Sequence, residues 1–134
     1  MNPTNVVPVI SQYVRPAILV GKTIKVRTGC GNLYITINRD ESSGRIIEVF
    51  TRLGKCGDCQ RAQNEAITRC VSIGLQAGVP ISAFVKQLKG IRCSEAVVGE
   101  EHILSCADAL AKELEKEVKI EVSPTPQQQR SEKD

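Results

Sequence analysis

Five of the six cysteines lie where a predicted element of the chain turns, begins or ends. Such positions converge in space more freely than side chains along one strand or one helix. Structural zinc takes four thiolate or imidazole ligands, and loops commonly supply them. The pattern therefore favours a metal site, with a redox-active pair or thiols of no special role as alternatives. The five residues are Cys30, Cys56, Cys59, Cys93 and Cys106.

Cys56 and Cys59 form a C-x-x-C pair, whose two-residue gap lets both thiols reach one ion or exchange a disulfide with each other. Cys59 and Cys106 are both predicted in the first turn of a helix, where unpaired backbone N–H groups stabilise a thiolate. A thiolate suits a metal ligand and a redox nucleophile equally. A thiol–disulfide enzyme using Cys56 and Cys59 is therefore one functional alternative.

Lys55, Gly57 and Asp58 precede a predicted helix and form a candidate anion site. The N-terminus of a helix attracts anions through its free N–H groups and its dipole. A small protein that holds a nucleotide or related anion there without catalysis, as a possible homo-oligomer, is a second alternative. Two other side chains have ordinary interpretations: Cys70 as a buried small hydrophobe and His102 as a surface or packing residue.

Period-2 alternation predicts strands at 23–28, 33–37 and 45–51, joined by short turns. Helical periodicity then predicts helices from Asp58 to Gly78, from Pro80 to Gly90, and from Ser105 onward, with Asp108 completing a capping box. The polar side of the third helix, including Asp108–Lys112, is interpreted as a solvated face. The order predicts an α+β fold: a three-stranded antiparallel meander followed by three helices packed on one face.

The chain has 134 residues, a net charge of +3, and only two Tyr, two Phe and no Trp. A stacking platform for nucleic acid needs several exposed rings beside a basic groove, so direct nucleic-acid binding is not expected. No apolar run is long enough to span a bilayer and no secretory signal is evident, which favours a cytoplasmic location without membrane contact. We expect an extended lead-in at 1–14, one domain at 15–122 and a disordered tail at 123–134.

Residues Gly21 to Asn38 resemble the opening of the TSCPD domain, which occurs near the C-terminus of adenosylcobalamin-dependent (class II) ribonucleotide reductases and in small stand-alone proteins. The name-giving signature is similar to Leu104-Ser-Cys-Ala-Asp108, where Leu104 and Ala107 replace the usual Thr and Pro. The resemblance covers about residues 15–118. Its other matching segments are Glu48–Phe50, Gly54–Lys55, Glu65–Ile67, Leu75–Pro80 and Gln87–Ile91.

The resemblance implies a stand-alone module that serves a ribonucleotide reductase in deoxyribonucleotide synthesis, as an accessory or docking domain without the catalytic barrel. It would be an enzyme only through its partner, the reductase large subunit, which alone would bind adenosylcobalamin. By residue matching, the resemblance also narrows the zinc ligands to Cys30, Cys59, Cys93 and Cys106, with Cys56 as alternate.

Overall fold

The computed structural model describes residues 13–54, 57–96 and 102–122 of the chain. Its elements follow the predicted order of three strands and then three helices. They are β1 (Val20–Thr28), β2 (Gly31–Arg39), β3 (Ile46–Leu53), α1 (Asp58–Gln76), α2 (Ile81–Leu88) and α3 (Cys106–Val122). The predicted tail, most of the predicted lead-in, Lys55 and Cys56 lie outside the described residues.

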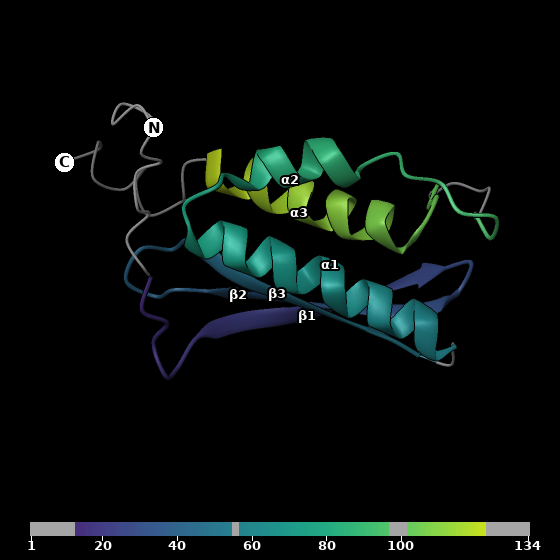
Figure 1. Cartoon of the computed structure of the whole chain (residues 1–134). Helices are drawn as coiled ribbons and strands as arrows, with labels where there is room; N and C mark the ends of the chain where they lie inside the picture. The colour runs from purple at the N-terminus through teal and green to yellow at the C-terminus, as the bar shows by residue number, and fades with distance from the viewer. Residues whose placement is uncertain (1–12, 55–56, 97–101, 123–134) are drawn as a thin grey trace, which may run out of the picture.

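The three strands form one antiparallel sheet in the order β1-β2-β3, and the helices all lie on one side of it (Figure 1). This confirms the predicted α+β architecture. Alternate residues of each strand turn toward the helices, so that Leu33, Ile35 and Ile37 are almost completely buried. α1 packs along β3, and α2 packs against α3.

The inward face of α1 differs from the predicted stripe at one position. It runs through Asn64, Thr68, Val71 and Leu75, which are all buried, whereas Cys70 is exposed. The prediction that Cys70 is buried is therefore wrong. The reason is that two of the inward residues, Asn64 and Thr68, are polar. A prediction of the buried face from the apolar residues alone is therefore displaced by about one position.

α3 is tied to the sheet by Glu117, whose side chain is 3% exposed and forms ion pairs with Lys22 of β1 and Arg39 of β2. Burial alone raises the pKa of Glu117, but the hydrogen bonds and charges of the two cations outweigh it, and the pKa lies below its usual range. The pair of contacts fixes the rotation of α3 against the sheet.

The start of α3 also departs from the prediction. Ser105 accepts a hydrogen bond from the Asp108 N–H at 3.0 Å, which confirms half of the capping box. The Asp108 side chain, however, is fully buried and turned toward the preceding loop rather than solvated. None of the helices in the described ranges is both long and apolar enough to cross a membrane.

Candidate metal centre

Three cysteines that are far apart in the sequence meet at one end of the molecule. Cys30 lies in the two-residue turn between β1 and β2, Cys93 lies in the loop after α2, and Cys106 is the first residue of α3. Cys93 and Cys106 both lie close enough to Cys30 for their charges to raise the pKa of its thiol. The Thr28 hydroxyl is 4.0 Å from the buried Cys106 sulfur. Three of the four predicted ligands therefore share one corner.

The pKa of the Cys30 thiol is raised to about 11, chiefly by burial and then by the nearby charges of Cys106, Cys93 and Glu95. The Cys30 thiol therefore resists losing its proton. A bound divalent cation reverses this balance, since metal ligation requires thiolates and supplies the positive charge that they lack.

The signature residues Ser105 and Asp108 hold the loop that carries Cys93. The Ser105 hydroxyl donates to the Ile91 carbonyl at 2.6 Å. The Asp108 carboxylate accepts from the backbone N–H groups of Gly90 at 2.8 Å and Leu104 at 3.0 Å. Together these bonds hold the beginning and the end of this loop at the start of α3.

Asp108 keeps its negative charge although it is buried. Burial raises its pKa, but the Lys112 ammonium and the two backbone N–H donors outweigh burial and lower it overall. The loop itself closes with a hydrogen bond from the Cys93 N–H to the Leu104 carbonyl at 2.9 Å. The effect of the signature is thus to hold the loop that carries Cys93 at the start of α3.

A glycine allows the Cys30 turn to reach this loop. A Cβ atom at Gly29 would lie 1.5 Å from the Glu95 carbonyl oxygen, so that only glycine permits the observed approach. The Thr28 hydroxyl shapes the same turn by donating to the Gly31 carbonyl and accepting from the Cys30 N–H. Sequence analysis did not single out Gly29 or Thr28; the flanking of a cysteine by two glycines was the available signal.

The predicted fourth ligand is less closely placed. Cys59 is exposed in the first turn of α1, and the neighbouring Gln60 amide lies 3.9 Å from the Cys106 sulfur. The start of α1 therefore borders the corner. In the described part of the chain, no group of three or more His, Cys, Asp and Glu side chains is arranged to hold a metal ion. Zinc ligation by these thiols therefore stays a prediction.

The predicted anion site is only partly described, because Lys55 lies outside the described residues. Gly57 is the N-cap of α1 and is exposed, which leaves Asp58 as the first helical residue rather than the cap. The Asp58 carboxylate is fully exposed and lies 3.9 Å from Arg61. His102 is exposed, in agreement with a surface role.

Comparison with known proteins places this geometry in a family. The chain belongs to the TSCPD domain family, whose model matches residues 7–118. It is 26% identical over 110 residues to the vitamin B12-dependent ribonucleotide reductase of Streptomyces clavuligerus. That match covers 82% of this chain but only 11% of the reductase. No solved structure matches the chain.

Proposed function

We propose that this domain serves a B12-dependent ribonucleotide reductase as an accessory or docking domain. The observation that carries the proposal is the match to such a reductase along most of this chain. Because the match covers a small part of the reductase, it concerns one domain rather than the whole catalyst. In this proposal the cobalamin and the radical chemistry belong to the reductase.

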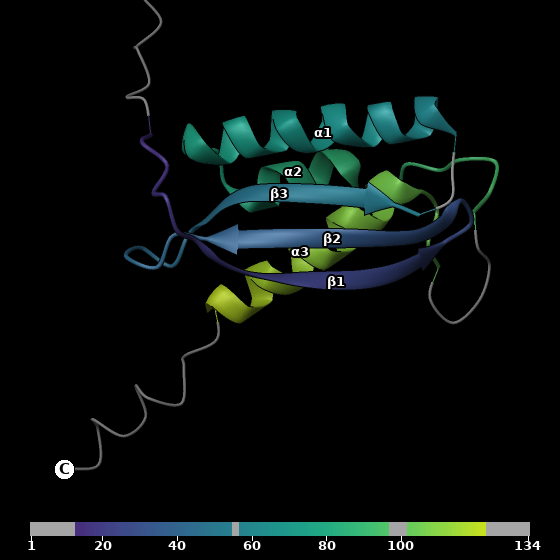
Figure 2. The same cartoon turned by 90° about the horizontal axis from the view of Figure 1, so that it is seen from below.

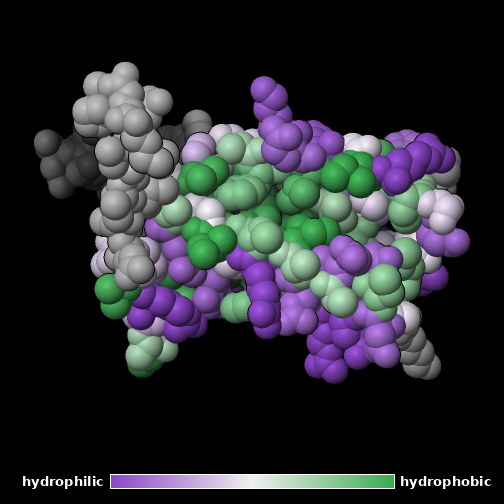
Figure 3. Space-filling view, in the orientation of Figure 1, coloured by the Kyte–Doolittle hydropathy of each residue, from purple (hydrophilic) through white to green (hydrophobic). Residues whose placement is uncertain are grey.

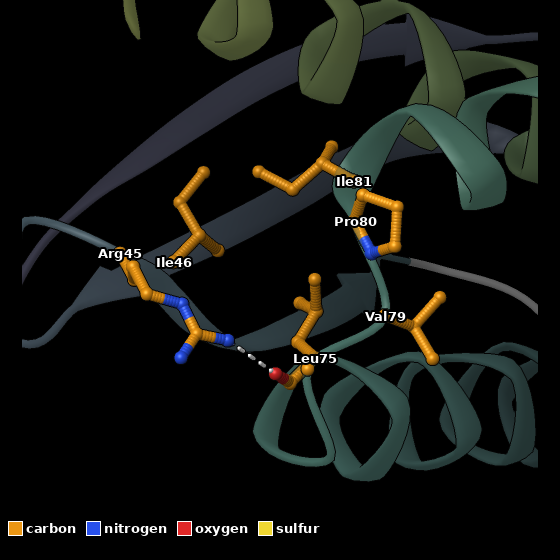
Figure 4. A pocket seen from close by; sticks show the side chains of 7 residues that line it. Arg45, Ile46, Leu75, Val79, Pro80 and Ile81 are labelled. Carbon is orange, nitrogen blue, oxygen red and sulfur yellow. Dashed lines mark hydrogen bonds between the residues drawn. The ribbon is translucent and has the colours of Figure 1, made fainter.

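The apolar end of α1 is the surface best suited to docking. Hydrophobic side chains gather on the side of the molecule that carries α1 and α2 (Figure 3). Ile73 is 69% exposed near the C-terminal end of α1, and Val79 is 38% exposed in the turn that follows it. Beside Val79 a pocket of about 350 Å³ opens between Ile46, Leu75 and Ile81, with Arg45 donating to the Leu75 carbonyl at its edge (Figure 4). Apolar surfaces of this kind commonly mark protein interfaces.

Binding to the reductase tests the docking role. The purified chain and the B12-dependent reductase of the same organism should form a complex that isothermal titration calorimetry detects. Ile73→Glu should weaken the complex at least tenfold, because it places a charge in an apolar contact. Ile18→Glu is the matched control, since Ile18 is 80% exposed and distant in the sequence from α1. Absence of a complex, or equal weakening by both variants, would contradict the proposal.

We also propose that one zinc ion joins Cys30, Cys93 and Cys106, with Cys59 or Cys56 as the fourth ligand. The convergence of three thiols from separate elements supports this proposal. Zinc bound there would act as a structural cross-link between the sheet and the start of α3, and would contribute directly to folding. A small core gains most from such a link.

Metal content tests the zinc proposal without an activity assay. Elemental analysis should find about one zinc per chain, and Cys106→Ser should lose the zinc and lower the melting temperature. Cys70→Ser is the matched control, because Cys70 is an exposed thiol on α1. Parallel Cys56→Ser and Cys59→Ser variants identify the fourth ligand. A zinc-free wild-type protein, purified without chelator, would overturn the proposal.

A further inference from the structure

The face of the sheet opposite the helices carries a pattern that the proposed function does not use. None of the described helices covers this face, which is turned toward the viewer in Figure 2. Its residues alternate with the buried ones, and the strand register aligns them in rows across the sheet. Two neighbouring rows, read from β1 to β3, are Thr23, Thr36, Phe50 and Lys25, Tyr34, Arg52.

Two aromatic rings lie next to each other on this open face. Tyr34 pairs with Arg52 and Thr36 pairs with Phe50, so that the two rings are diagonal neighbours on adjacent strands. Tyr34 is 37% exposed and Phe50 is 48% exposed. A shallow hollow of about 520 Å³ lies over them, with Thr23 and Thr36 on its floor.

Three cations at one end of this face have no carboxylate partner within the described ranges. Among the described residues, Lys25, Arg27 and Arg52 form no ion pair, whereas Lys22, Lys89, Lys112 and Lys116 each do. Glu48 shares the open face but lies at its other end. There it accepts hydrogen bonds from Arg15 at 2.9 Å and from Asn38 at 2.7 Å. The surface beside Tyr34 is therefore positively charged.

We propose that this face binds nucleoside phosphates, either free or as part of a single strand. A base stacks on Tyr34 and Phe50, because ring faces attract the π-face of any base. The phosphate lies among Lys25, Arg27 and Arg52, whose charges have no ion-pair partner among the residues that the structure describes. Rings beside cations fit a ligand with one flat apolar end and one anionic end better than they fit an acidic protein segment. The inference does not depend on docking to a reductase.

Fluorescence anisotropy with a labelled twelve-nucleotide thymidine single strand tests the proposal, with unlabelled ATP and dATP as competitors. The full chain should bind the strand at low salt and lose affinity as salt rises. Phe50→Ala and Arg52→Glu should each weaken binding about tenfold. Ile73→Ala and Lys86→Glu are matched controls on the helical side and should change binding less than twofold, with circular dichroism confirming that all variants fold.

The competitors distinguish the two sources of the ligand. Displacement of the strand by micromolar ATP or dATP identifies a free nucleotide site, and binding of the strand without displacement identifies a single-strand site; either result supports the proposal. Two results overturn it. The first is no binding of strand or nucleotide at 50 mM salt. The second is binding that Arg52→Glu weakens but Phe50→Ala leaves unchanged, since that describes a general anion surface without stacking.

Discussion

The Asp108 carboxylate accepts a hydrogen bond at 2.8 Å from the backbone N–H of Gly90, a residue 18 positions earlier in the chain. Gly90 ends the turn after α2 with a φ of 90°, which glycine adopts without strain. This bond makes the signature of the family a structural clamp: a charge at the start of α3 holds the beginning of the loop that carries Cys93.

Replacement of Asp108 should show the strength of the clamp. Asp108→Asn removes the charge and turns an amide toward one of the two backbone donors, so the free energy of unfolding should fall by about 2–4 kcal/mol. Lys112→Met keeps both backbone bonds and should cost less. Urea denaturation measures both variants, and an equal loss would mean that the ion pair, not the backbone contact, is the main contribution.

Gly29→Ala should separate the Cys30 turn from the Cys93 loop. The added Cβ would overlap the Glu95 carbonyl, so the backbone must move. We expect a lower melting temperature and faster reaction of the buried Cys106 thiol with a thiol reagent. Gly54→Ala is the matched control, because the nearest atom to its Cβ is the Asn32 oxygen at 3.6 Å. Wild-type reactivity in Gly29→Ala would show that the approach is not needed.

Glu117→Gln should weaken the attachment of α3 to the sheet. The amide cannot pair with both Lys22 and Arg39, so we expect a loss of about 1–3 kcal/mol in the free energy of unfolding. Glu65→Gln is the control, since its ion pair with Arg69 is exposed and should contribute no more than about 0.5 kcal/mol. Guanidinium denaturation compares the two, and similar losses would contradict a special role for Glu117.

Stability should fall in acid partly through Asp40. Hydrogen bonds from the Ser42 side chain, then from Tyr13 and the Ser42 N–H, hold the pKa of Asp40 at about 2, against a usual 3.8. The unfolded chain therefore binds the proton more readily, and the stabilisation present above pH 3.8 is lost as the pH falls toward 2.

Asp40→Asn should remove part of this acid dependence. Its melting temperature should change less between pH 4 and pH 2 than that of the wild type, because no proton is taken up at this site. Glu41→Gln, at the exposed neighbouring residue, should keep the wild-type slope. A thermal melt series at several pH values makes the comparison, and parallel slopes for wild type and Asp40→Asn would refute the assignment.

Local patterns were sufficient to predict the elements. The alternation of Leu33, Ile35 and Ile37 is confirmed as the buried side of β2, and the periodic residues Val71 and Leu75 are buried in α1. Period and turn residues act over a few positions, so they can be recognised in one sequence. The same alternation implied that Tyr34 points outward, and only the register with β3 shows that Phe50 lies beside it.

Contacts between distant residues were harder to predict. Asp108 was interpreted as solvated because its helical neighbours are charged, yet its partners Gly90 and Leu104 belong to a loop whose path depends on the whole fold. Cys70 was misplaced because Asn64 and Thr68, both polar, occupy the inward face of α1. Burial of a polar residue follows from partners that periodicity does not reveal.

The corner formed by the cysteines has a consequence for biosynthesis. Thr28 and Cys106 meet across 78 positions, so the corner cannot form until the start of α3 has left the ribosome. Until then the Cys30 thiol on the nascent chain is open to oxidants and to other thiols. Slow translation would therefore prolong the stage before α3 packs against the turn, during which a non-native disulfide could form at Cys30.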